Sequence, residues 1–267
     1  MRKIVIAIIG IIVIVIAVFA FSLVFLVPGH YVGYAVRVQG NYAYVADSAG
    51  VTILDVSEPS RSSVISNLAF AHGALGIQVK NSLAFIATDS EGFAIADISD
   101  PNNPIKLGKY GETALEVCID GSYAYITIRD VGLQILDIKN PELITKVGEL
   151  NGLGRGDDVE VHQGIVYYAD GSSNQGSLKV INVTDPSAPQ KIKDIAGISG
   201  VFDIHICEDA NLLFLACHSF GVRIMNISNP QSPSVISSYI KTDGEAYGVS
   251  GNSTHLYVAD LQQGAYL

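Results

Sequence analysis

The chain has 267 residues, a mean hydropathy of +0.35 and a formal net charge of −10, with 26 acidic residues against 16 basic ones. A chain this acidic repels the phosphate backbone of nucleic acids, so we expect no nucleic-acid partner. The three cysteines are too few, and odd in number, for a disulfide-stabilised scaffold.

The first predicted element is an apolar segment at the N-terminus. Arg2 and Lys3 precede 24 residues, 4–27, that carry no charge. As a helix this segment spans about 36 Å, enough to cross a hydrocarbon core of about 30 Å. We therefore expect a cytoplasmic stub (1–3), a transmembrane helix (4–27) and a linker (28–33), with the remainder outside the cell membrane. The alternative is a signal that is cleaved, which leaves the protein secreted.

Beyond the linker, an internal repeat organises the sequence. The unit Tyr42–Pro59, YAYVADSAGVTILDVSEP, returns in related form at Leu83–Pro101, Tyr123–Pro141, Ile165–Pro186 and Leu212–Pro230, and as a partial copy at His255–Leu267. The equivalent positions 55, 97, 137, 182 and 226 lie 42, 40, 45 and 44 residues apart. That period fits a four-stranded propeller blade of about 40–50 residues and is too long for helical repeats of about 33–34 residues.

Each period also has the local pattern of a blade. It holds short apolar runs of strand length separated by turn residues, and no run shows the 3.6-residue periodicity of a helix over ten or more positions. A proline follows the third run of each complete repeat, where it ends the strand and sets the next turn. The sequence thus predicts an all-β propeller over 34–267, with blades at about 34–73, 74–113, 114–157, 158–201 and 202–246 and a partial blade at 247–267.

The repeat unit resembles the LVIVD-repeat proteins, a family of prokaryotic surface-type β-propellers. The resemblance runs from about Tyr31 to the end of the chain, and no tryptophan is present that would suggest WD-type blades. It implies a propeller fold and an exported location. It transfers no catalytic residue, because the matching positions are those that build the blade.

About five and a half blades are present, because the sixth copy stops as its third strand begins. Propellers close by pairing the first and last blades, which removes exposed strand edges. We therefore expect either a truncated chain with further residues in the native protein, or a partner chain that supplies the missing strands.

The loops between blades vary most, and variable loops on a regular scaffold are where binding is normally placed. We expect them to form a binding face near the propeller axis. The candidate residues on this face are His72, Glu112, Arg155, Asp157, Asp158, Asp203, Asp243 and Glu245.

A second set of loops carries aspartates near the ends of the second strands, at Asp47, Asp89, Asp130, Asp170 and Asp260. Such carboxylates can hold a cation or a basic partner, or they can bond to their own loop backbones. Asp170, Ser172 and Asn174 resemble the first half of a calcium loop. The glycine of that loop comes one position late, and Ile181 stands where a calcium loop has a bidentate glutamate. Calcium is therefore a possible ligand, and no other cofactor is expected.

The sequence also contains other short motifs. Arg155–Asp157 spells RGD, and Asn182, Asn226 and Asn252 begin glycosylation sequons. Cys118, Cys207 and Cys217 are expected to be buried thiols. The six histidines show no zinc spacing, and neither a G-x-S-x-G elbow nor a P-loop occurs, so no catalytic residue is assigned.

These features predict a membrane-anchored, exported propeller that binds a protein or carbohydrate partner at the cell surface. The alternatives are a propeller hydrolase or lyase acting on envelope polymers, and a structural component of a surface layer. An enzyme is distinguished by ionisable groups with shifted pKa values that converge in one pocket.

Overall fold

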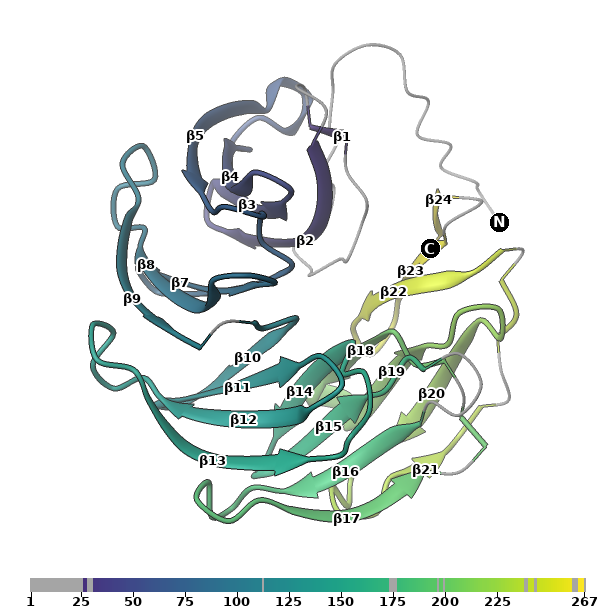
Figure 1. Ribbon diagram of the computed structural model, residues 1–267. Coiled ribbons are helices and arrows are strands. Elements are labelled where there is room, and N and C mark those ends of the chain that lie inside the picture. The colour runs from purple at the N-terminus through teal and green to yellow at the C-terminus, as the bar shows by residue number, and fades with distance from the viewer. Residues whose placement is uncertain are drawn as a thin grey trace. The chain divides into compact units, whose positions relative to one another are not determined.

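The protein is described by a computed structural model that covers residues 26–27, 31–111, 113–172, 177–195, 197–198, 200–237, 240–242, 244–260 and 264–266 (Figure 1). These residues form antiparallel sheets joined by short turns, with two 3₁₀ helices and no α-helix among them. The predicted all-β class and the four-stranded blades are confirmed.

Two compact units are distinguished. The N-terminal unit holds the described residues up to Ile126 together with Asp137–Thr145, and the C-terminal unit holds Thr127–Leu136 and the described residues from Lys146 onward. The boundary passes through the third sheet.

The first three sheets run in simple sequential order. The first contains β1 (Leu26–Val27), β2 (Tyr31–Gln39), β3 (Tyr42–Asp47), β4 (Gly50–Asp55) and β5 (Ser63–Ala69), with the 3₁₀ helix η1 (Pro59–Arg61) before β5. The second contains β6 (Gly76–Lys80), β7 (Leu83–Thr88), β8 (Gly92–Asp97) and β9 (Ile105–Tyr110). The third contains β10 (Val117–Asp120), β11 (Tyr123–Ile128), β12 (Gly132–Asp137) and β13 (Thr145–Asn151).

The remaining sheets belong to the C-terminal unit. The fourth contains β14 (Asp158–His162), β15 (Ile165–Ala169), β16 (Leu178–Asn182) and β17 (Gln190–Ile195). The fifth contains β18 (Asp203–Cys207), β19 (Leu212–Ala216), β20 (Val222–Asn226) and β21 (Ser234–Val235), with the 3₁₀ helix η2 (Glu208–Ala210) after β18. The sixth has three described strands, β22 (Ala246–Gly251), β23 (Leu256–Asp260) and β24 (Gly264–Tyr266).

The predicted transmembrane helix lies outside the described residues except for Leu26–Val27, which pair with Val32 and Tyr31 of β2. Strand β2 thus begins inside the range predicted as a linker. Among the residues that the structure describes, no helix is long and apolar enough to cross a membrane.

Burial explains the hydrophobic pattern of the repeat. The second and third strands of a blade are buried along nearly their whole length, as in β7 and β8, because both of their faces pack within the unit. In the C-terminal unit, β15 and β16 share one apolar cluster with β19, so neighbouring blades bury each other's faces. The fourth strand, such as β9, is largely exposed and accordingly polar.

The most regular position of the repeat is a turn-forming residue after the third strand. Asp55, Asp97 and Asp137 each accept a hydrogen bond at 2.8 Å from the backbone amide two residues later. Asn182 and Asn226 do the same at 2.9 and 2.8 Å. This Asx turn needs only a side-chain carbonyl oxygen, which is why aspartate and asparagine alternate there.

The proline that ends a repeat unit uses its backbone carbonyl group to contact the preceding blade. The Ser66 hydroxyl donates to the Pro101 carbonyl at 2.6 Å, and the Tyr167 hydroxyl donates to the Pro230 carbonyl at 2.9 Å. Gly108 and Gly148 occupy the position of Ser66 in their blades. A Cβ atom on either would overlap the carbonyl oxygen of Pro141 or Pro186.

Candidate functional site

A group of half-buried aromatic side chains and charged side chains lies in the C-terminal unit, where segments from three sheets meet. We call it the aromatic patch and define it by Arg155, Phe202, His218, Glu245 and Tyr247. Arg155 comes from the β13–β14 loop, Phe202 directly precedes β18 and His218 lies in the β19–β20 loop. Glu245 directly precedes β22, and Tyr247 is the second residue of that strand.

Backbone hydrogen bonds fix these positions. The amide of His218 donates to the carbonyl of Ala246 at 2.9 Å, and the amide of Ala246 donates to the carbonyl of His218 at 3.0 Å. This bridge holds His218 at a left-handed φ of 49° and places it beside Tyr247. The amide of Phe202 donates to the Ala216 carbonyl at 3.0 Å, which extends the β18–β19 pairing to the patch.

The three rings pack on one another. The Phe202 ring centroid lies 5.2 Å from that of His218 and 5.1 Å from that of Tyr247, and the His218 and Tyr247 rings meet edge to face at 5.1 Å. These separations suit aromatic attraction. Nε2 of His218 lies 3.0 Å from the Tyr247 hydroxyl and 3.3 Å from Oε2 of Glu245.

Arg155 is oriented by a carboxylate on one side and a ring on the other. Its Nε lies 2.9 Å from Oδ1 of Asp157, and its guanidinium carbon lies 5.6 Å from the Phe202 ring centroid. The arginine and the aspartate of the RGD tripeptide are therefore paired with each other. Gly156 between the two has a φ of +70°, and a Cβ atom there would overlap the Tyr168 hydroxyl, so only glycine fits.

Two buried aspartates lie beneath Arg155. Burial raises the pKa of Asp157 to about 6, against the lowering effect of the Arg155 charge and of the hydrogen bond from Gly171. Burial also acts on Asp170, but the hydrogen bonds from Ser172 and Lys179 outweigh it and lower its pKa. Lys179 is itself buried and lies 3.0 Å from Oδ2 of Asp170. Asp170 thus belongs to a buried ion pair.

The other predicted binding residues are placed differently. The Asp158 carboxylate accepts a hydrogen bond from the amide of Ile204 at 2.8 Å, and that of Asp203 accepts one from the amide of Val249 at 2.6 Å. Each of these aspartates therefore ties its own sheet to the next one. His72, in the N-terminal unit, is exposed and contacts the Ser90 hydroxyl at 2.6 Å. Glu112 and Asp243 lie outside the described residues.

The structure therefore brings together three predicted residues, Arg155, Asp157 and Glu245. It adds Phe202, His218 and Tyr247, which the sequence reasoning missed. Phe202 and Tyr247 stand at the ends of two of the variable loops, and an aromatic residue in such a loop was the available signal.

The calcium hypothesis stays a prediction. Ser172 donates its hydroxyl to Oδ1 of Asp170 at 2.6 Å, Lys179 occupies Oδ2, and Asn174 lies outside the described residues. Within the described ranges, no three His, Cys, Asp or Glu side chains form a metal-binding group. Asp47 bonds to its own loop through the amides of Ala49 and Gly50 at 2.7 and 3.1 Å.

Asp89 and Asp130 of that set differ from Asp47, whereas Asp260 is buried as Asp47 is. Asp89 and Asp130 are exposed in their loops, because Thr88 and Ile128 hold the strand-end position in those blades. The sequon asparagines Asn182, Asn226 and Asn252 use their side-chain carbonyls as turn acceptors, and glycosylation there stays a prediction.

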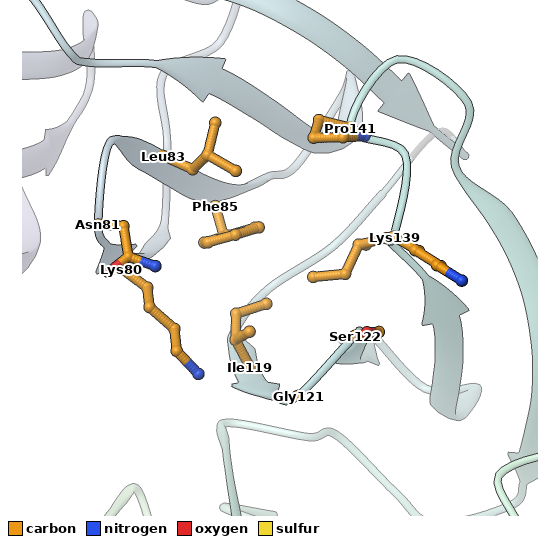
Figure 2. A pocket seen from close by; sticks show the side chains of 10 residues that line it. Lys80, Asn81, Leu83, Phe85, Ile119, Gly121, Ser122, Lys139 and Pro141 are labelled. Atoms are coloured by element: carbon orange, nitrogen blue, oxygen red, sulfur yellow. The ribbon is translucent and has the colours of Figure 1, made fainter.

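The N-terminal unit contains a separate pocket of about 250 Å³ (Figure 2). Leu83, Phe85, Ile119 and Ile138 form its apolar lining. Lys80 and Lys139 also line the pocket, and they lie on opposite sides of it in the view of Figure 2. Because its charged groups do not converge, this pocket offers less specific recognition than the aromatic patch.

The sequence profile of the LVIVD repeat matches residues 33–69, 73–112 and 111–151, three consecutive repeats. The chain carries LVIVD repeats. The predicted resemblance is thereby confirmed, and the sheets of the structure are consistent with an LVIVD-repeat β-propeller family. No curated protein matches the chain in sequence.

Solved structures resemble the LVIVD-repeat chain in fold alone. A functionally unknown protein from Desulfotomaculum acetoxidans superposes with a TM-score of 0.70 at 10% identity, covering 92% of this chain and 90% of its own. A chain of a mitotic checkpoint complex gives 0.71 at 13% identity, covering 88% and 73%. Kuenenia stuttgartiensis hydrazine synthase gives 0.64 at 14% identity, covering 83% and 71%. At these identities the likeness carries no function across.

Proposed function

We propose that this LVIVD-repeat protein is a binding scaffold displayed outside the cell membrane, and that its aromatic patch takes up a protein or carbohydrate partner. The observation that carries the proposal is the patch itself. Three rings from separate segments of the chain are left half-buried, with Arg155 and Glu245 beside them. Aromatic residues and arginine contribute much of the energy at binding surfaces.

The scaffold supports this use because it needs little rearrangement on binding. The patch loops are tied to strands by backbone hydrogen bonds, and Arg155 is held by Asp157 before any partner arrives. Groups fixed in advance lose less conformational entropy when they bind.

Membrane attachment through residues 4–27 is part of the proposal and rests on the sequence. The uncharged segment is long enough to span a bilayer, and Arg2 and Lys3 favour a cytoplasmic N-terminus. We expect the full chain to remain in membranes washed with alkaline carbonate and to be cut by protease added to intact cells. Release by carbonate contradicts the anchor, and full protease resistance contradicts the outward orientation.

A hydrolase acting on envelope polymers is the second candidate, favoured by the raised pKa of Asp157. The hydrogen bonds argue against it. Oδ1 of Asp157 is taken by Arg155 and Oδ2 by the amide of Gly171 at 2.8 Å. Asp170 is engaged by Ser172 and Lys179. Proton transfer to a substrate requires a carboxyl oxygen that faces it. Release of reducing ends from envelope polymers by the wild-type protein, lost in Asp157→Asn, would favour the enzyme.

The binding function is tested with the full chain in detergent micelles and sedimented cell envelopes. We expect the double variant Arg155→Ala/Tyr247→Ala to lose about tenfold or more in envelope affinity. Arg61→Ala/Tyr34→Ala is the matched control, because it removes an exposed arginine and a 41% exposed tyrosine that belong to the N-terminal unit and are not part of the patch. Equal binding by all three proteins would contradict the proposed role of the patch.

A further inference from the structure

The aromatic patch presents hydrogen-bond donors. The Arg155 side chain is 44% exposed, and in the part of the chain that the structure describes its terminal nitrogens have no hydrogen-bond partner. Since Nε is held by Asp157 and the guanidinium stands over Phe202, these donors form a planar fork of fixed orientation. Such a fork suits two acceptors on neighbouring atoms of a ligand.

The patch also presents hydrogen-bond acceptors. Glu245 is 28% exposed, and its Oε2 is 3.3 Å from Nε2 of His218. Its other carboxylate oxygen has no partner among the described residues. A ligand that contacts both residues must therefore accept hydrogen bonds from Arg155 and donate hydrogen bonds to Glu245. A hydroxyl group does both.

The positive charge of the patch is compensated locally, because Arg155 is paired with Asp157. Nε2 of His218 contacts the Glu245 carboxylate at 3.3 Å. A strongly acidic peptide finds no unpaired cation there, and the pair that Arg155 already makes weakens its attraction. The patch instead favours a neutral ligand rich in hydroxyl groups.

The aromatic rings supply an apolar surface for the ligand. Phe202 and Tyr247 are half-buried and tilted by 58° to each other, so part of their apolar surface faces solvent beside the polar groups. A pyranose unit has an apolar C–H face and a rim of vicinal hydroxyls. It can pack that face on the Tyr247 ring while its rim reaches Arg155 and Glu245.

We propose that the aromatic patch is a subsite for a neutral saccharide unit, with Arg155 donating to its hydroxyls, Glu245 accepting from them and Tyr247 packing on its C–H face. This inference rests on the proposed binding function and names the ligand class of the same site.

Isothermal titration calorimetry of the full chain with cellohexaose, chitohexaose, maltohexaose and mannohexaose tests the proposal. We expect at least one of these to bind, with affinity lowered about tenfold in Tyr247→Ala and in Arg155→Ala. Tyr247→Phe keeps the ring and is expected to stay within about threefold of wild type. Tyr34→Ala and Arg61→Ala are the controls with no expected change. Absence of binding to all four sugars, or binding that the patch variants leave unchanged, overturns the saccharide assignment.

The failure of this inference is distinguishable from failure of the proposed function. Periodate cleaves the vicinal diols of envelope glycans and leaves most of the protein chain intact. If patch-dependent envelope binding survives periodate treatment, the partner is a protein, so the saccharide inference falls and the binding function stands. If envelope binding does not depend on the patch at all, both fall.

Discussion

Asp170 accepts a hydrogen bond at 3.2 Å from the backbone amide of Arg155 and thereby ties the β15–β16 loop to the loop that carries the patch arginine. The reverse bond also exists, because Asp157 accepts one from the amide of Gly171 at 2.8 Å. Each loop thus supplies a carboxylate to the backbone of the other. The position of Arg155 in the patch therefore depends on a buried ion pair that lies behind it.

Removing the charge of Asp170 is expected to destabilise the C-terminal unit. Asp170→Asn keeps a carbonyl oxygen for Arg155 and Ser172, but it leaves the ammonium of Lys179, whose side chain is only 9% exposed, without its main counter-charge. Breaking one side of a buried pair costs about 3 kcal/mol of unfolding free energy. Urea denaturation followed by circular dichroism measures this loss.

The double variant separates charge from packing. Asp170→Asn/Lys179→Met removes both charges of this ion pair and is expected to recover most of the lost stability. Lys191→Met is the matched control, because Lys191 forms an exposed pair with Asp194, and it is expected to change stability by less than about 0.5 kcal/mol. A double variant no more stable than the single one argues against a charge effect.

Asp157 makes stability depend on pH in a defined direction. Its pKa in the folded protein is about 6, above the ordinary value of 3.8, so folding favours the protonated form. Its stabilising contribution is fully present below about pH 4 and is lost as the pH rises through about 6. Asp157→Asn removes this dependence. Relative to wild type, the variant should gain up to ~3 kcal/mol of unfolding free energy between pH 4 and pH 7.

Urea titrations of both proteins at pH 4, 5, 6 and 7 provide the check. The quantity to compare is the difference between the two unfolding free energies at each pH, because all other titrating groups largely cancel in it. A difference that is constant across the four values would show that Asp157 titrates with its ordinary pKa.

The blade architecture was predictable because it depends on local rules. The Asx turn of Asp55, Asp97 and Asp137 spans two residues, and proline ends a strand wherever it stands. The turn residue and the proline recur once in each repeat, so the repeat length could be determined directly from the sequence. The lengths of the second and third strands followed from their unbroken apolar runs, which are buried in the structure.

The aromatic patch was not predictable, since it depends on contacts between loops of different blades. His218 lies beside Tyr247 because its backbone forms a β-bridge with Ala246, 28 residues farther along the chain. No local sequence pattern predicts this bridge. Asp158 and Asp203 looked like binding residues because they are acidic and near variable loops. Both bond to a backbone amide 46 residues away, and that inter-blade register is invisible in a single sequence.

The proline-carbonyl contact between blades predicts a steric effect at Gly148. Its backbone has a φ that alanine can adopt, but a Cβ atom would overlap the Pro186 carbonyl oxygen. Gly148→Ala is therefore expected to cost about 2 kcal/mol by overpacking. Gly111→Ala is the control, because its φ of +76° disfavours alanine while the space around it is open, and it should cost only about 1 kcal/mol. Thermal unfolding of both variants measures the two losses. If Gly148→Ala is no less stable than Gly111→Ala, the contact with the Pro186 carbonyl is not rigid.

The pocket of the N-terminal unit predicts a stabilising substitution (Figure 2). Phe85 stands where three other blades have Tyr44, Tyr125 and Tyr167, and its ring and Pro141 both line the pocket. In Phe85→Tyr the new hydroxyl enters this space and can donate to the Pro141 carbonyl, as Tyr167 does to Pro230. We expect a gain of about 0.5–1 kcal/mol in unfolding free energy. A lower melting temperature would show that the pocket lacks room for the hydroxyl.

The three thiols are expected to be unreactive in the folded protein. Cys118, Cys207 and Cys217 are all buried, and no disulfide forms among the described residues, which confirms the predicted buried thiols. Burial raises the pKa of Cys217 to about 12, against the lowering effect of Arg223, so almost no reactive thiolate is present near neutral pH. Ellman's reagent at pH 8 should therefore label none of the three in the native protein and all three in 6 M guanidinium chloride. Labelling in low denaturant should proceed at the rate at which the sheets open. A thiol that reacts within seconds in buffer would show that it is not buried in its blade.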